Sequence, residues 1–180
     1  MQKLKTYPPP AIVRIITLVA FVTFFILAFI LLPLDGRLQA AGSGIVDYEL
    51  AFTSDRATEM LNAWGAAGQD TMRDSLFLDF PFLLSYGLAF SGLTLLIGRA
   101  QSGRLASLGL WLAPAGMIAA ACDAVENVLL FTTLGHAVVP ALPILVAGIC
   151  ASVKFALWLV VFVYWLVSGV TWGLRKLRAP

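Results

Sequence analysis

Six polar residues lie within long apolar stretches of this 180-residue chain, and their side chains suit proton transfer or cation binding. They are Asp79 and Tyr86, then Asp123, Glu126 and Asn127, and finally Lys154. The first two are seven residues apart and the next three follow an i, i+3, i+4 spacing, so each group shares one face of a helix. Carboxylates accept protons and bind cations, whereas an ammonium group or a phenol stabilises negative charge.

Placing these groups inside a bilayer is costly, because an ionisable side chain near its centre costs at least about 2.5–3.5 kcal/mol on insertion scales. With a helical rise of about 1.5 Å per residue, we expect the six side chains to meet in the outer half of one bundle. Three acids against one lysine leave an excess of two negative charges if all are ionised. Like charges repel strongly in a low-dielectric medium, so we expect at least one carboxyl group to carry a proton.

Two interpretations of this cluster stay open at the level of sequence. In the structural one, Asp123 or Glu126 pairs with Lys154, Asn127 binds a neighbouring backbone, and the network only fixes helix packing. In the functional one, the cluster binds a cation, a proton or a polar headgroup, since acids inside membrane spans are functional candidates by default.

The remaining composition argues against several other chemistries. One His and two Cys exclude a disulfide-rich fold, a zinc finger and a His-built di-metal site, so we expect no metal site. The chain contains no Gly-rich phosphate loop, HExxH, GxSxG or CxxC motif, and no cofactor can be named. A net charge of +2 without a basic stripe argues against nucleic-acid binding.

The elements that position the six residues are membrane spans. The chain is 60% hydrophobic and only 12% charged, with a mean hydropathy of +0.90, and soluble chains carry about twice that charged fraction. Apolar runs predict four helical spans within a single membrane domain, residues 1–180, at about 15–33, 76–98, 105–131 and 141–172. The first run is too long for a signal-peptide core of about 7–15 residues, which favours a retained anchor.

Charged residues at the span ends predict the orientation. Eight cations and no acid flank one set of ends: Lys3, Lys5, Arg14, Arg99, Arg104, Arg175, Lys176 and Arg178. Three arginines and seven acids flank the other: Arg37, Arg56 and Arg73, with Asp35, Asp47, Glu49, Asp55, Glu59, Asp70 and Asp74. Lysine and arginine are enriched on the cytoplasmic side, so we expect both termini to be cytoplasmic.

Residues 34–74 form a segment between the first two spans that is too long for a simple connection. Apolar and polar residues alternate over 46–52, which predicts an extended, half-buried strip. A short amphipathic helix follows, with Met60, Leu61 and Trp64 on one face, and Gly65 and Gly68 are expected to end it. This helix either rests on the outer membrane surface or forms a lid over the bundle.

Four stretches carry a resemblance to a known group of proteins: YELAFTSDRATEMLNAW, SLFLDFPFLLSYGLAF, CDAVENVLL and ASVKFALW. Over residues 46–160 they resemble small bacterial four-span integral membrane proteins of unassigned function. The resemblance implies an architecture, a bacterial plasma-membrane location and a shared set of polar positions, but no activity. The positions that it carries over are Trp64, Asp79, Tyr86, Asp123, Glu126, Asn127 and Lys154.

The sequence therefore predicts an all-α four-helix transmembrane bundle with an outer cap. Three functions stay open: binding or translocation of a cation, proton or small amphiphile, an enzyme acting on a lipid-like substrate, and an assembly subunit. No nucleophile–base pair can be recognised, so binding ranks above catalysis. The expected partners are the lipid bilayer, such a small cation or amphiphile, and another membrane protein or a second copy of the chain.

The charge asymmetry predicts that Ser43→Cys and Ser102→Cys variants are labelled from opposite sides of the membrane, with position 43 outside. The measurement is labelling of intact cells or oriented vesicles with a membrane-impermeant thiol reagent. Labelling of both positions from one side would overturn the four-span topology.

Overall fold

The computed structural model describes residues 2–177, and within these it is helical without β-strands, in agreement with the predicted all-α class. The seven helices are α1 (Gln2–Thr6), α2 (Pro10–Ala40), α3 (Ile45–Glu49), α4 (Ser54–Ala100), α5 (Gly103–Leu112), α6 (Ala115–Thr133) and α7 (Ala141–Leu177). Four segments are long and apolar enough to cross a membrane: α2, α4, α5 together with α6, and α7. Each contains one of the predicted spans.

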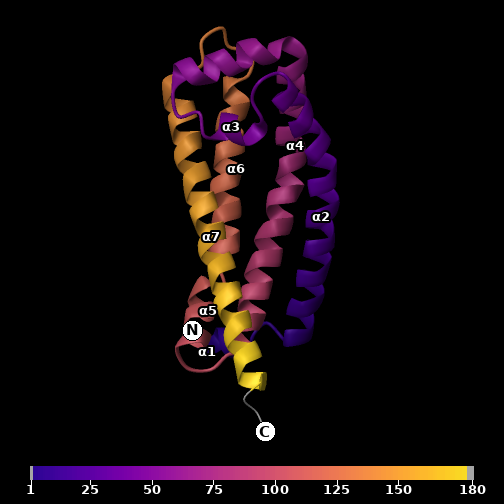
Figure 1. Cartoon of the computed structure of the whole chain (residues 1–180), viewed down its shortest axis with the longest axis vertical. Helices are drawn as coiled ribbons and strands as arrows, with labels where there is room; N and C mark the ends of the chain where they lie inside the picture. Colours follow the sequence, from indigo (N-terminus) through magenta and orange to yellow (C-terminus); the bar gives the residue numbers. More distant parts are fainter. Residues whose placement is uncertain (1, 178–180) are drawn as a thin grey trace.

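The four long segments stand side by side in an elongated bundle (Figure 1). Helix α3 lies near one end of this bundle, which we call the α3 end. Helix α1 and the last turns of α7 lie at the opposite end, which we call the terminal end. Helix α4 packs on both α2 and α6, and α6 packs on α7, whereas α2 packs mainly on α4. Helix α4 is therefore the central element and α2 the least buried one.

Helix α4 contains a sharp break at Gly65. The backbone there has φ 60° and ψ −167°, a conformation that favours glycine because it has no Cβ. The segment before the break, residues 54–64, crosses the bundle at the α3 end, and the rest of α4 runs toward the terminal end (Figure 1). The crossing segment buries Met60, Leu61 and Trp64 against Tyr48 and other apolar residues.

The extended strip that we predicted over residues 46–52 is wrong, because residues 45–49 form the short helix α3. Its first turn is capped by two carboxylates: Asp47 accepts a hydrogen bond from the Gly44 amide at 2.8 Å, and Asp35 accepts one from the Ile45 amide at 2.7 Å. A strand would place Tyr48 and the residue that follows it on opposite faces, whereas the helix buries both. Burial raises the pKa of Tyr48 to about 12.

The connection between α3 and α4 is docked on α7 through Phe52. This residue has φ +59°, a left-handed conformation that is an outlier for a bulky L-residue. Its ring lies against Gly148, where an added Cβ would be 2.7 Å from the ring carbon Cδ1. The strained backbone is held because the flanking residues are fixed: Ser54 donates a hydrogen bond to the Val139 carbonyl at 2.5 Å, and the Val139 amide donates one to Thr58 at 3.0 Å.

This docking predicts different effects for two glycine substitutions on α7. Gly148→Ala inserts a methyl group into the Phe52 contact, so we expect it to destabilise the protein by about 1–3 kcal/mol. Gly169→Ala, in open space on the same helix, is the matched control and is expected to change stability by less than about 1 kcal/mol. Thermal unfolding in a mild detergent measures both. Equal melting temperatures for the two variants would contradict the contact.

Candidate functional site

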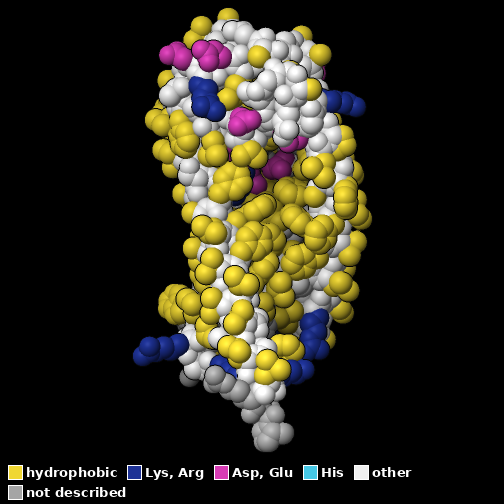
Figure 2. All heavy atoms as spheres, viewed as in Figure 1, with side chains coloured by type: hydrophobic (Ala, Val, Ile, Leu, Met, Phe, Trp, Pro, Cys, Tyr) yellow, Lys and Arg dark blue, Asp and Glu magenta, His cyan; other side chains and the backbone are white. Residues whose placement is uncertain are grey.

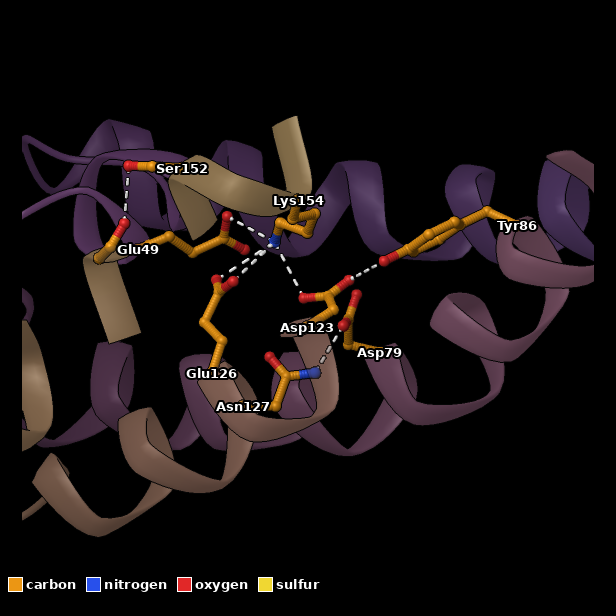
Figure 3. Close-up of polar contacts among 9 residues, drawn as sticks. Glu49, Asp79, Tyr86, Asp123, Glu126, Asn127, Ser152 and Lys154 are labelled. Atoms are coloured by element: carbon orange, nitrogen blue, oxygen red, sulfur yellow. Dashed lines mark hydrogen bonds and ion pairs between the residues drawn. The ribbon is translucent and has the colours of Figure 1, made fainter. Parts of the chain in front are cut away.

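The candidate site is centred on the ammonium group of Lys154, which is buried at the α3 end of the bundle. Its Nζ donates hydrogen bonds to Asp123 at 2.9 Å, to Glu49 at 3.0 Å and to Glu126 at 3.2 Å (Figure 3). The four side chains come from α3, α6 and α7, and each residue is less than 9% exposed. A buried ammonium with three carboxylate acceptors satisfies all three of its donors.

Two further hydrogen bonds extend this arrangement to α4. The Tyr86 hydroxyl donates to Asp123 Oδ2 at 2.8 Å, and Asn127 Nδ2 donates to Asp79 Oδ2 at 2.6 Å (Figure 3). All six residues predicted from the sequence therefore lie together, with one further residue that was not predicted (Figure 3). Tyr86 joins the hydrogen bonds around Lys154, whereas Asp79 and Asn127 form a separate hydrogen-bonded pair beside them. We call this group the polar cluster: Glu49, Asp79, Tyr86, Asp123, Glu126, Asn127 and Lys154.

Helix periodicity and close helix contact position these side chains. The i, i+3, i+4 spacing of Asp123, Glu126 and Asn127 places all three on the face of α6 that packs against its neighbours. Helices α4 and α6 approach closely at two glycines, because a Cβ on Gly116 would lie 2.8 Å from the Gly87 carbonyl oxygen. This contact is one residue from Tyr86, so it brings the α4 phenol within reach of α6.

Glu49 is the member that the sequence analysis missed. Its position in the sequence predicts an acid that flanks the membrane, on the polar face of the extended strip. In α3 it follows the buried Tyr48 by one residue, and a helix turns by only about 100° per residue, so both side chains point inward. Burial raises the pKa of Glu49 above its ordinary value, although the Lys154 ammonium acts in the opposite direction.

The polar cluster holds more negative groups than positive ones. It contains four carboxyl groups, from Glu49, Asp79, Asp123 and Glu126, and one ammonium group, and only the Asp79 carboxyl group does not contact that ammonium. If all were ionised, the cluster would carry a net charge of −3, which low-dielectric surroundings oppose strongly. Bound protons or an added cation relieve this excess, so the arrangement suits cation or proton binding.

Two acids have acceptor capacity left over. Among the residues that the structure describes, Glu126 Oε2 accepts no hydrogen bond, although it lies 3.2 Å from the Lys154 ammonium. The Asp79 carboxylate does not contact that ammonium and is bound by Asn127. Asp79 is also the only one of the four acids that is partly exposed rather than buried. Asp79 is therefore the acid best placed to meet a group that enters from outside.

The three candidate lid residues lie apart from the carboxylates. Trp64 packs on Tyr48, with ring centroids 5.0 Å apart, and its indole donates to the Ser43 carbonyl at 2.8 Å. Met60 and Leu61 belong to the same apolar group. The crossing segment contacts α3 through Tyr48, which precedes Glu49 of the polar cluster in the chain. Within residues 2–177 no group of His, Cys, Asp and Glu is arranged to hold a metal ion.

No family model, curated protein or solved structure matches this chain. The class of protein is therefore defined by the fold and the site. Four long apolar helices that enclose a buried lysine–carboxylate cluster are the features of a multi-pass integral membrane protein.

The geometry predicts a large effect of removing the lysine. Lys154→Met leaves buried carboxylates without their cation, and the loss of one partner from a buried ion pair costs about 3–5 kcal/mol. Combining it with Glu49→Gln, Asp123→Asn or Glu126→Gln should recover part of this loss. Unfolding in detergent measures each double-mutant cycle.

The matched control is Lys176→Met, since Lys176 is exposed near the end of the same helix and should contribute little to stability. Strictly additive effects of Lys154→Met and Glu49→Gln would mean that α3 is not held by this ion pair.

Proposed function

We propose that the protein binds a cation or a proton at the polar cluster, within a four-span integral membrane bundle. The observation that carries this proposal is the imbalance of charge: the polar cluster holds four carboxyl groups and one ammonium group in apolar surroundings, and only three of the carboxyl groups contact the ammonium. Exchange of a proton or a cation at this site is the elementary step of ion translocation, and the site can serve binding or translocation alike.

We assign the exchangeable position to Asp79. Lys154 already neutralises part of the charge on Glu49, Asp123 and Glu126, and these three side chains hold it in place. Asp79 is outside that set of ion pairs and is more exposed. A cation at Asp79 would therefore bind without displacing the lysine.

The distribution of charge supports an orientation with both termini in the cytoplasm. Arg14, Arg99, Arg104, Arg175 and Lys176 belong to the parts of the chain that lie toward the terminal end. The space-filling view shows Lys and Arg side chains gathered there and most acidic side chains at the α3 end (Figure 2). In this orientation the polar cluster lies in the outer half of the membrane.

The same orientation makes α3 and residues 54–64 an outer cap. The crossing segment lies over the bundle at this end, and Glu49 connects α3 to Lys154. Loss of that ion pair would free α3, so we assign the cap the role of a lid over the cation site. On the resemblance described above, the membrane is the plasma membrane of a bacterium.

A structural role is the second candidate, and one observation favours it. Lys154 has all three of its donors satisfied by residues of the chain itself. An ammonium bound in this way fixes α3, α6 and α7 relative to one another even if nothing else binds.

Asp79→Asn separates the two candidates. The amide can still accept the hydrogen bond from Asn127, so we expect the melting temperature to stay close to that of the wild type. The neutral amide cannot compensate the charge of a cation. We therefore expect Asp79→Asn to abolish the carboxylate infrared difference bands that methylammonium chloride induces in the wild-type protein. Asp74→Asn, on an exposed position of the same helix, is the control and should leave those bands unchanged.

The result against cation binding would be a set of methylammonium-induced bands that is the same in Asp79→Asn as in the wild type, or absent from both. The polar cluster would then be assigned the structural role.

A further inference from the structure

Below the polar cluster, α4 continues the same face with aromatic rings. Asp79 is followed at i+3, i+7 and i+11 by Phe82, Tyr86 and Phe90, so the four side chains form one stripe along the helix. Neighbouring rings are in contact, with centroids 5.7 Å apart from Phe82 to Tyr86 and 5.7 Å from Tyr86 to Phe90. The stripe thus begins with a carboxylate near the α3 end and continues with aromatic groups toward the terminal end.

Helix α7 presents a matching stripe. Lys154 is followed at i+4, i+8 and i+11 by Trp158, Phe162 and Trp165. These three rings all meet Phe90 of α4, each with a centroid separation of 5.2 Å. Both helices therefore place a charged residue at the α3 end and aromatic residues along the remaining length of the shared face.

Helix α2 completes this region without packing closely on α7. The gap between them is bridged by rings: Phe21 lies 6.4 Å from Phe90 and 6.5 Å from Trp165 between centroids. Phe24 stacks on Phe82 at 5.1 Å. The space-filling view shows a hollow between α7 and α2, with a hydrophobic surface and with acidic side chains toward its α3 end (Figure 2).

One acceptor of the polar cluster has no hydrogen bond among the described residues. Glu126 Oε2 is buried and lies 3.2 Å from the Lys154 ammonium without accepting a hydrogen bond from it. A buried acceptor without a hydrogen bond is costly, so this atom favours a bound donor such as a second ammonium group.

We propose that the hollow between α2, α4 and α7 binds an amphiphile with a protonated amine headgroup, whose hydrocarbon tail lies along the aromatic stripes. This inference rests on the proposed function, since the headgroup would occupy the cation position at Asp79. The surplus of carboxylates attracts an ammonium group and repels an anionic headgroup. Aromatic faces also attract cations, as the Lys154 ammonium 4.8 Å from the Phe155 ring centroid illustrates.

The tail requires an open route from the lipid phase. The hollow faces outward between α7 and α2 (Figure 2). Phe162, whose ring contacts Phe90, is 41% exposed. An alkyl chain can therefore enter sideways from the bilayer while its headgroup stays at the depth of the polar cluster. The site is thus expected to select ligands that have both a positively charged headgroup and a hydrocarbon tail.

The experiment titrates the full chain, purified in a maltoside detergent, with four probes: dodecylammonium, dodecanol, dodecanoate and ethylammonium. Thermal stabilisation and native mass spectrometry report binding. We expect dodecylammonium to bind at least about tenfold more tightly than dodecanol, because of its charge-assisted hydrogen bonds. We also expect it to bind more tightly than ethylammonium, because only the longer probe buries a tail.

Two variants test the two parts of the site. Asp79→Asn should bring the affinity for dodecylammonium down to that for dodecanol, whereas the exposed Asp74→Asn should not. Trp158→Leu should lower the affinity for dodecylammonium but leave the affinity for ethylammonium unchanged. Its control is Phe29→Leu, an aromatic residue on α2 that is 72% exposed and takes no part in the aromatic contacts described above.

The outcomes separate this inference from the proposed function. If ethylammonium binds at Asp79 as tightly as dodecylammonium does, the cation site stands and the amphiphile site is wrong. If dodecanol, dodecanoate and dodecylammonium bind equally, the hollow takes any tail and the headgroup assignment is wrong. If neither ammonium probe binds in a way that depends on Asp79, both proposals fail.

Discussion

The arrangement of this bundle depends on the ion pairs that the buried Lys154 ammonium makes with three carboxylates. A buried charge is tolerated only when oppositely charged and hydrogen-bonding partners surround it. Here the partners of Lys154, on α7, are one carboxylate from α3 and two from α6. The requirement fixes α6 against α7 and draws α3 into the bundle through Glu49. The Phe52–Gly148 contact then holds the connection that leads from α3 to the crossing segment of α4.

The Lys154 ammonium is satisfied in its hydrogen bonds, but the polar cluster is not balanced in charge. Lys154 has as many acceptors as donors, yet Asp79 adds a fourth carboxyl group that no cation of the chain contacts. Packing alone would be served as well by an asparagine at that position, which would cost less to desolvate. The surplus acid is therefore the feature that the structural role leaves unexplained and that cation binding explains.

Much of the fold follows from local patterns in the sequence. Long apolar runs predict the four spanning segments, and the spacing of Asp123, Glu126 and Asn127 predicts their shared face, because both depend only on helix geometry. The alternation of apolar and polar residues over 46–52 led to the wrong prediction of an extended strip, because so short a pattern is compatible with a strand or a helix. Helix α3 is decided by contacts distant in sequence, with the Asp35 carboxylate at its start and Lys154 at its end. Glu49 could not be assigned to the cluster without them.

The position of the surplus charge relative to the aromatic stripes argues for a ligand with two chemically different ends. A site for a small ion needs only the polar cluster, and the aromatic stripes, in which Phe162 is exposed and Phe82, Trp158 and Trp165 are partly exposed, add nothing to it. A site for an ordinary lipid tail needs only the rings, and a carboxylate at one end of the hollow would disfavour the phosphate of most lipid headgroups. Both α4 and α7 place the charged residue at the α3 end and the rings toward the membrane interior. An amine at one end and a hydrocarbon chain at the other is the chemistry that uses both features together.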